Sequence, residues 1–198
     1  MGRGLGRAIC GKREEITLVW LIAFLMHALR KLLPALQTTF KHETAMFRAE
    51  PALAEFLERS CFSLLQEDSK ITLSRAVSGY EVQVTFPALA FPEGEEAMAV
   101  PFEVTVQREQ AALLFHCSRH KDVLRVEGLK HSQQDYEGPD FATLDPVLRQ
   151  LWLEFLHTLG VDDALAEFVE AYALEAEQKL YLRWLQEAKT VVGSQSDK

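Results

Sequence analysis

Acidic side chains gather in one stretch near the C-terminal end of the chain. Residues 162–177 hold six carboxylates and no lysine or arginine. They are Asp162, Asp163, Glu167, Glu170, Glu175 and Glu177. Acid/base catalysis needs carboxylates placed together in a desolvated pocket, whereas a run along a helix face leaves them in water. We therefore predict a surface that attracts basic partners by charge. The alternative is a solvated helix face with no binding role. Asp162 could equally be a helix cap.

Two other patterns could suggest a metal or cofactor site. His116 and His120 are four residues apart, but the alternating apolar and polar residues around them predict a strand, where four residues span about 13 Å. One metal with bonds of about 2 Å cannot bridge that distance. Gly2, Gly4 and Gly6 follow no strand, and the nucleophile-elbow, P-loop, HExxH and EF-hand patterns do not occur. The sequence predicts no enzyme, no metal site and no cofactor.

The three cysteines, Cys10, Cys61 and Cys117, are widely spaced and form no CxxC pair. An odd number at such spacing is not a disulfide framework and favours a reducing compartment. We expect Cys61 and Cys117 to be buried as small apolar side chains.

Charge is divided unequally along the 198 residues, which suffice for one ordinary domain. Residues 1–41 hold seven Lys/Arg and two Asp/Glu, and residues 42–198 hold fourteen and twenty-seven, a net charge of 14 − 27 = −13. Such a body repels phosphate backbones and anionic lipid and attracts basic proteins. We therefore expect nucleic acid to be bound only indirectly.

The later part of the first 42 residues has the composition of a transit peptide. The apolar run 16–29 is shorter than the roughly 20 residues of a membrane span, and Glu14 and Glu15 directly before it suit a secretory signal poorly. From Met26, an alternative start, the chain is basic, amphipathic and free of acids until Glu43. We predict removal of residues 1–42, with the mature chain starting between about Gln37 and Phe47, and no stable membrane insertion. A membrane anchor remains the alternative.

Periodicity predicts the elements that must position the acidic stretch. Residues 50–65 have helical spacing, although their C-terminal part could already be strand. Alternation over 70–86, with a turn at Ser78 and Gly79, and over 102–106, 112–116 and 123–129 predicts antiparallel strands joined as a meander. The segment from Glu93 to Glu96 lies in a loop between them.

Two helices follow the predicted strands. Asp145 and Pro146 indicate an N-cap and first helical residue, Gly160 indicates the end of that helix, and a final helix runs from about Asp162 to Lys189. We expect their apolar stripes to lie in the core or in a subunit interface, with residues 193–198 frayed. The candidates are Trp152, Phe155, Phe168, Tyr172, Tyr181, Trp184 and Leu185. Residues 43–192 are thus one α+β domain with helices on one face of an antiparallel sheet.

One further pattern runs through the C-terminal half of the chain: the segment from Tyr136 to Phe141, then Leu144, Asp145 and the Gly160-Val161 pair. It is similar to the C-terminal signature of the mitochondrial glycoprotein family, acidic matrix proteins that include a receptor for complement globular heads. It continues through Leu148, Leu156, Leu165, Tyr181, Trp184 and Leu185, and the strand segments 73–86, 101–106 and 113–117 resemble the family too. The resemblance covers about residues 50–190.

The resemblance implies a highly twisted antiparallel sheet of about seven strands, flanked by one N-terminal and two C-terminal helices, in a doughnut-shaped homotrimer. It also implies a mitochondrial matrix location, no catalytic residues, and adaptor or chaperone-like work near RNA processing, ribosomes and translation. The leading hypothesis is an acidic scaffold that binds basic mitochondrial proteins, including RNA-binding or ribosomal proteins. A direct RNA-binding protein is the alternative, and an unrecognised enzyme comes last. The chain departs from the family in its shorter N-terminal helix and its reduced acidic insertion, Glu93 to Glu96.

Overall fold

The computed structural model describes residues 7–88, 100–132, 136 and 138–193. Gly2, Gly4 and Gly6, the loop acids Glu93 to Glu96, and residues 194–198 lie outside the described residues. The chain divides into two compact units. Residues 48–180 form what we call the sheet unit, and residues 1–47 together with 181–198 form the helical unit.

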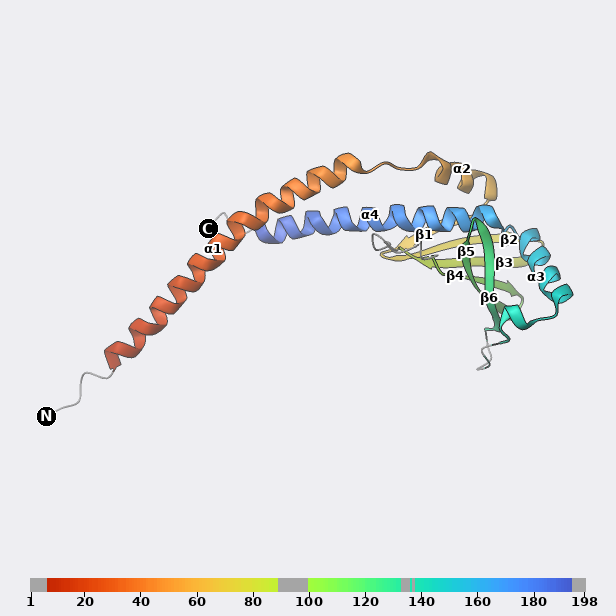
Figure 1. The fold of residues 1–198 in the computed structure, drawn as a ribbon, viewed down its shortest axis with the longest axis horizontal. Coiled ribbons are helices and arrows are strands. Elements are labelled where there is room, and N and C mark those ends of the chain that lie inside the picture. Colours follow the sequence, from red (N-terminus) through yellow and green to blue (C-terminus); the bar gives the residue numbers. More distant parts are fainter. Residues whose placement is uncertain (1–6, 89–99, 133–135, 137, 194–198) are drawn as a thin grey trace. The chain divides into compact units, whose positions relative to one another are not determined.

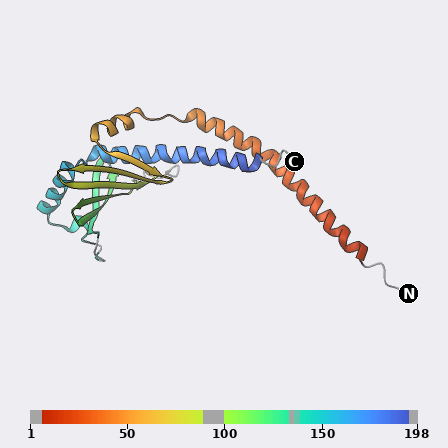
Figure 2. The same ribbon diagram turned by 180° about the vertical axis from the view of Figure 1, so that it is seen from behind.

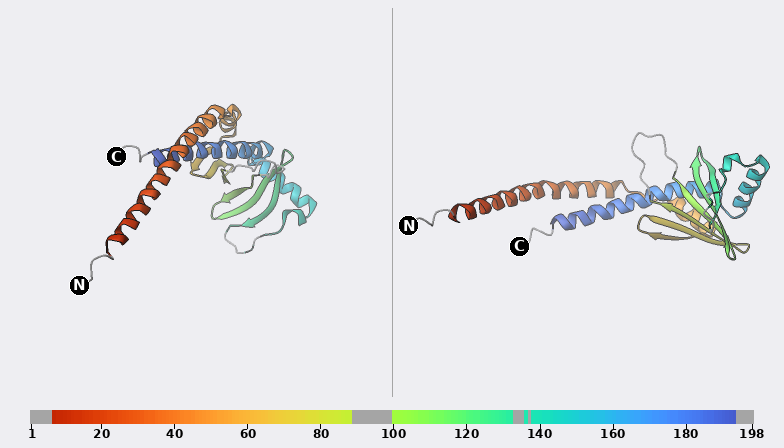
Figure 3. Two further views of the ribbon diagram at one scale, coloured as in Figure 1. Left: turned by 60° about the vertical axis from the view of Figure 1, so that its left-hand side comes forward. Right: turned by 90° about the horizontal axis from the view of Figure 1, so that it is seen from below.

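The sheet unit is built on six antiparallel strands whose spatial order is their order in the chain (Figure 1). They are β1 (Ser63–Glu67), β2 (Lys70–Val77), β3 (Tyr80–Pro87), β4 (Phe102–Arg108), β5 (Ala111–His120) and β6 (Val123–His131). The strands fan out as the sheet twists (Figure 3). The meander predicted from alternation is confirmed. The described strands number six, against about seven implied by the resemblance.

Strand β1 occupies the segment for which periodicity left helix and strand open. Helix α2 (Pro51–Ser60) ends where Cys61 adopts a left-handed backbone conformation, with φ of 57°. The chain reverses there, and Leu65 then pairs with Thr72 of β2. A residue with positive φ cannot continue a right-handed helix, so the backbone is free to join the sheet.

The predicted helix signals after the sheet are also confirmed. A short turn, η1 (Phe141–Thr143), precedes α3 (Pro146–Thr158) and α4 (Asp163–Gly193). The Asp145 carboxylate accepts hydrogen bonds from the backbone N–H groups of Val147 and Leu148 at 2.9 and 3.3 Å. Gly160 has φ of +80°, and a Cβ atom there would lie 2.2 Å from a guanidinium nitrogen of Arg75. The positive φ therefore favours glycine here, and a larger residue would also displace the end of the Arg75 side chain.

The core of the sheet unit lies between one face of the sheet and the helices. Opposite residues on adjacent strands, such as Ile71 with Phe86 and Val84 with Val104, are fully buried. The first half of α4 runs along this face (Figures 1 and 2). Its Leu165, Ala166, Phe168, Val169, Ala173 and Ala176 are buried, as is Leu156 of α3.

Aromatic rings join the sheet to its helices. Phe86 meets Tyr172 of α4 edge-to-face with ring centroids 6.3 Å apart, and Phe115 meets Trp152 of α3 at 5.7 Å. Phe155 contacts Tyr80, and Phe168 stacks on Tyr172 and on Phe56 of α2. The aromatic stripes of α3 and of the first half of α4 therefore lie in the core of the sheet unit.

The helical unit holds α1 (Arg7–Met46) and the end of α4. Leu185 is buried, whereas Tyr181 and Trp184, expected to face inward, are 36% and 57% exposed in the single chain. Their rings stack on each other with centroids 6.1 Å apart. A single helix has less apolar surface than a six-stranded sheet to cover such rings, so these two residues do not lie in the core of one chain, and their place in a subunit interface stays a prediction.

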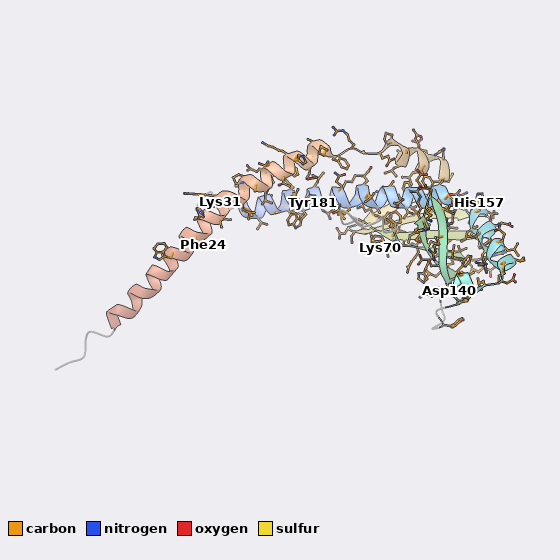
Figure 4. The ribbon with its side chains drawn as sticks, viewed as in Figure 1. Phe24, Lys31, Lys70, Asp140, His157 and Tyr181 are labelled. Atoms are coloured by element: carbon orange, nitrogen blue, oxygen red, sulfur yellow. The ribbon has the colours of Figure 1, made fainter. Side chains whose placement is uncertain are left out.

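The side chains of α1 that the structure describes are largely exposed. Phe24, which projects from the helix (Figure 4), is 76% exposed, and Trp20 is 72% exposed. The Nζ atom of Lys189 in α4 lies 3.8 Å from the centroid of the Phe40 ring. No helix within the described part of the chain combines the length and apolar character needed to cross a membrane.

Candidate functional site: an acidic cleft along α4

Three of the six predicted acids line one cleft of about 370 Å³ in the sheet unit. Glu167, Glu170 and Glu175 come from successive turns of α4. The segment before α2 and strand β5 complete the lining, which also includes Arg48, Glu50, Arg119, Ala171, Leu174 and Gln178. Because carboxylates outnumber guanidinium groups in it, we call this the acidic cleft.

Arg119 of β5 is the main cation of the acidic cleft. Its guanidinium donates hydrogen bonds to Glu170 and, at 2.7 Å, to Asp122. The hydrogen bond that Arg119 donates to Glu170 raises the pKa of Arg119, and the nearby charges of Glu170, Asp122 and Glu167 raise this pKa further against the opposing effect of burial. Arg119 therefore stays cationic, and its contact with Glu170 joins the sheet to α4.

Glu175 is engaged on both carboxylate oxygens. One accepts a hydrogen bond from the backbone N–H of Glu50 at 3.0 Å, and the other lies 2.6 Å from Nζ of Lys179. Its side chain is only 12% exposed. Glu175 thus holds the segment that precedes α2 against α4.

The two aspartates at the start of α4 make local contacts. Asp162 accepts a hydrogen bond from the backbone N–H of Leu165 at 3.0 Å, which makes it the helix cap that the sequence allowed. Asp163 accepts one from the backbone N–H of Leu124 at 2.7 Å, linking α4 to the start of β6.

The remaining two acids, Glu167 and Glu177, differ in how far their side chains are exposed to solvent. Glu167 is exposed at the mouth of the acidic cleft, and Glu177 is partly exposed on the following turns of α4. Of the six predicted acids, the structure therefore brings Glu167, Glu170 and Glu175 together and uses Asp162, Asp163, Glu170 and Glu175 in contacts within the chain.

Sequence reasoning missed Arg119 and Arg48, which share the acidic cleft. Alternation could not assign a face to Arg119, because the register shifts between His116 and Cys117. After this irregularity both Cys117 and Ser118 are buried. A run of two apolar or small residues inside an alternating strand, here Cys117-Ser118, was the available signal of a bulge.

The cysteine and histidine side chains singled out in the sequence do not line the acidic cleft. Burial, reinforced by the charge of Glu127, raises the pKa of the Cys117 thiol to about 12, so it stays protonated at neutral pH. His116 and His120 both lie on β5, as predicted, and His116 Nδ1 is 3.6 Å from a carboxylate oxygen of Glu103. Cys61, expected to be buried, is exposed because it terminates α2 at the surface. Within the described ranges no three His, Cys, Asp or Glu side chains could hold a metal ion.

A twisted antiparallel meander covered by C-terminal helices, with acids along the last helix, defines a class of acidic α+β protein. The family model described as mitochondrial glycoprotein matches residues 89–192. The chain belongs to the mitochondrial glycoprotein family.

Two relatives carry mitochondrial names. An uncharacterized mitochondrial protein of Arabidopsis thaliana is 27% identical over 143 residues, which are 62% of this chain and 57% of that protein. The mitochondrial acidic protein mam33 of Schizosaccharomyces pombe is 34% identical over 68 residues, 34% of this chain and 24% of that protein. The matched region therefore spans less than two thirds of either relative.

Two solved structures share the fold. A hypothetical protein from Leishmania major, described as a sequence homologue of human p32 protein, has a TM-score of 0.66 at 18% identity. The match covers 82% of this chain and 98% of that one. The Trypanosoma brucei p22 protein has a TM-score of 0.67 at 17% identity, covering 83% and 98%.

Proposed function

We propose that this protein is a non-enzymatic adaptor of the mitochondrial matrix that binds basic proteins, including RNA-binding or ribosomal proteins, through the acidic cleft. By doing so it modulates mitochondrial RNA processing or translation without contacting the nucleic acid itself. Family membership, the mitochondrial names of the relatives and the net charge of −13 over residues 42–198 support this proposal.

The observation that carries the proposal is the position of Arg119. Its guanidinium lies against Glu170 and within electrostatic reach of Glu167 on the neighbouring turn of α4. The exposed carboxylate of Glu167 lies one helical turn from Glu170, whose carboxylate already binds Arg119. A basic side chain of a partner could bind Glu167 through the same kind of contact. Charge-assisted hydrogen bonds between guanidinium and carboxylate groups are the strong ones in proteins.

The proposal includes a homotrimer, for which the stacked rings of Tyr181 and Trp184 are the candidate contact. Large exposed aromatic rings are typical of subunit interfaces. Sedimentation of the purified chain should give three subunits. If Trp184 is buried between copies, Trp184→Ala should cost roughly 3 to 5 kcal/mol, whereas a negligible thermal shift would leave this ring on the surface.

We also propose that residues 1–42 direct the chain to mitochondria and are removed there. The absence of acids from residues 16–42 and the reversal of charge at Glu43 support this boundary. N-terminal sequencing of the protein from isolated mitochondria should find a start between about Gln37 and Phe47. Recovery of an intact segment 3–25 in that protein would contradict it.

The central experiment measures capture of a basic matrix protein by the purified chain, with and without nuclease. Changing Glu167, Glu170, Glu175 and Glu177 together to Gln would also break the internal contacts of Glu170 and Glu175. The sharper variant therefore changes only Glu167 and Glu177. Its matched control changes Glu55 and Glu58, two exposed acids of α2 that do not line the acidic cleft.

We expect the Glu167/Glu177 variant to lose affinity while the α2 control keeps it, and affinity to fall steeply as salt screens the charges. Capture that survives nuclease identifies direct protein partners. Equal affinity for both variants, with thermal unfolding unchanged, would show that these acids only keep the protein soluble. Capture that disappears with nuclease would favour direct binding of RNA.

A further inference from the structure

A second cleft, of about 730 Å³, lies between strand β6, the η1 turn and the first turns of α3. Figure 4 shows Asp140 near this end of the sheet, with His157 in the last turn of α3. The lining includes Arg125, Glu127, Asp140, Arg149 and Gln150. It shares no residue with the acidic cleft, and we call it the arginine cleft.

The two guanidinium groups of the arginine cleft have no acceptor in the part of the chain that the structure describes. The Nε atom of Arg149 is buried and makes no hydrogen bond. Neither Arg149 nor Arg125 forms an ion pair with a described residue. A buried donor without an acceptor costs free energy and calls for an explanation, such as an ordered water molecule or an ion.

The carboxylates in the same lining already accept other hydrogen bonds. One oxygen of Glu127 accepts from the hydroxyl of Ser118 at 2.9 Å. One oxygen of Asp140 accepts from the backbone N–H of Ala142 at 2.9 Å and so caps η1. The two acids therefore lower the net charge of the arginine cleft without occupying the donors of its arginines.

Other arginines of this acidic sheet unit have partners. Arg119 pairs with Glu170, Arg108 donates to the Tyr80 hydroxyl at 3.2 Å, and Arg75 lies over the Phe62 ring. Arg125 is exposed to solvent, whereas Arg149 is only partly exposed, so the guanidinium of Arg149 without a described acceptor is the feature that distinguishes this cleft.

We propose that the arginine cleft binds a small ligand through a single oxyanion, a phosphomonoester or a carboxylate, with Arg149 as the main donor and Arg125 as the second. The planar guanidinium fork matches the oxygen spacing of either group. The cleft is within the volume range of small-molecule sites. Glu127 and Asp140 make the formal charge of the lining 2 − 2 = 0, which disfavours a polyanion such as a nucleic-acid strand. This proposal is independent of the partner-binding proposal.

The test follows the Nε–H resonance of Arg149 by NMR in the purified full chain while inorganic phosphate or acetate replaces chloride at constant ionic strength. Arg149→Gln removes the charge, Arg149→Lys keeps the charge without the fork, and Arg59→Gln on α2 is the control outside the cleft. Binding by each variant is measured by calorimetry after thermal unfolding confirms that it is folded.

We expect the Arg149 resonance to shift and saturate with phosphate, with acetate or with both. We also expect affinity at least about tenfold weaker in Arg149→Gln, the loss of one charge-assisted hydrogen bond, and unchanged in Arg59→Gln. Saturation with phosphate alone identifies a phosphomonoester site, and saturation with acetate alone identifies a carboxylate site. If Arg149→Gln fails to fold, weaker binding by Arg149→Lys carries the proposal. An unresponsive Arg149 resonance, or equal affinity in the wild-type protein and a folded Arg149 variant, overturns it.

Discussion

The acidic cleft and the arginine cleft each contain an arginine whose Nε atom is buried and unbonded, Arg119 in one and Arg149 in the other. The terminal nitrogens of Arg119 donate to Glu170 and Asp122, whereas the guanidinium of Arg149 meets no described acceptor. One cation is therefore part of the framework that joins sheet and helix, and the other makes no ion pair with a described residue.

An excess of acidic residues in the sequence does not decide which carboxylates are free to bind a partner. Three acids of α4, Glu170, Asp163 and Glu175, hold β5, β6 and the segment before α2 in place. Within the acidic cleft Glu167 is an exposed acid, while the Nε atom of Arg149 is a buried donor without an acceptor in the arginine cleft. Substitutions in the two clefts should consequently have effects of different size and sign.

The largest expected effect is that of Arg119→Met. It leaves Glu170 without its partner in a contact where both side chains are only about a fifth exposed, at 20% and 22%. Breaking a buried pair from one side costs several kcal/mol, and partial exposure reduces this to about 2 to 3 kcal/mol. Chemical denaturation of the single variant measures it. The double variant Arg119→Met, Glu170→Met should regain most of the lost free energy of unfolding. That result would confirm that the unpaired carboxylate of Glu170 causes the loss.

A smaller loss is expected from Asp163→Ala, which removes the acceptor of the Leu124 N–H group. The loss of one charge-assisted hydrogen bond near the surface should cost about 1 kcal/mol. Hydrogen exchange at Leu124 should accelerate, while exchange in β2 and β3 stays slow. Unchanged protection at Leu124 would mean that this contact does not fasten the β5–β6 hairpin.

Arg149→Met should act in the opposite direction from Arg119→Met. It replaces an unsatisfied buried donor by an apolar side chain of similar length, so without ligand we expect a gain of about 0.5 to 1 kcal/mol. Thermal unfolding in chloride buffer checks the sign. A loss comparable to that of Arg119→Met would erase the distinction between the two clefts.

The smallest expected effect on stability is that of Glu167→Gln, within about 0.5 kcal/mol, because its exposed side chain lies at the surface. The parallel substitution Glu170→Gln weakens the contact with Arg119 and should be clearly destabilising. Comparing the two by denaturation separates acids that hold the fold from acids that are free to meet a partner.

Sequence patterns were sufficient where the physical cause is local. Alternation predicted five of the strands, and the short-range hydrogen bonds of Asp145 and the positive φ of Gly160 are visible as residue types at fixed offsets. The pairing of Glu175 with the Glu50 backbone spans 125 residues, and that of Arg119 with Glu170 spans 51. Such contacts depend on the register of the sheet and on its irregularity between His116 and Cys117, for which the sequence offers only the break in alternation at Cys117-Ser118. The arginine cleft was missed because Arg125 and Arg149 belong to no sequence motif and come together only in the folded chain.

The order of the strands has a consequence for how the chain folds. Since each strand pairs with the one before it, the sheet forms from local contacts with small loop-closure costs, and a chain that emerges N-terminus first can pair each strand as it appears. The helices α3 and α4 come last, so the apolar face around Val84, Val104 and Phe115 stays open to water until residues beyond Pro146 arrive. A chain ending before α3 would present that face as a template for aggregation. Truncation should therefore be more harmful to this protein than its small, regular sheet suggests.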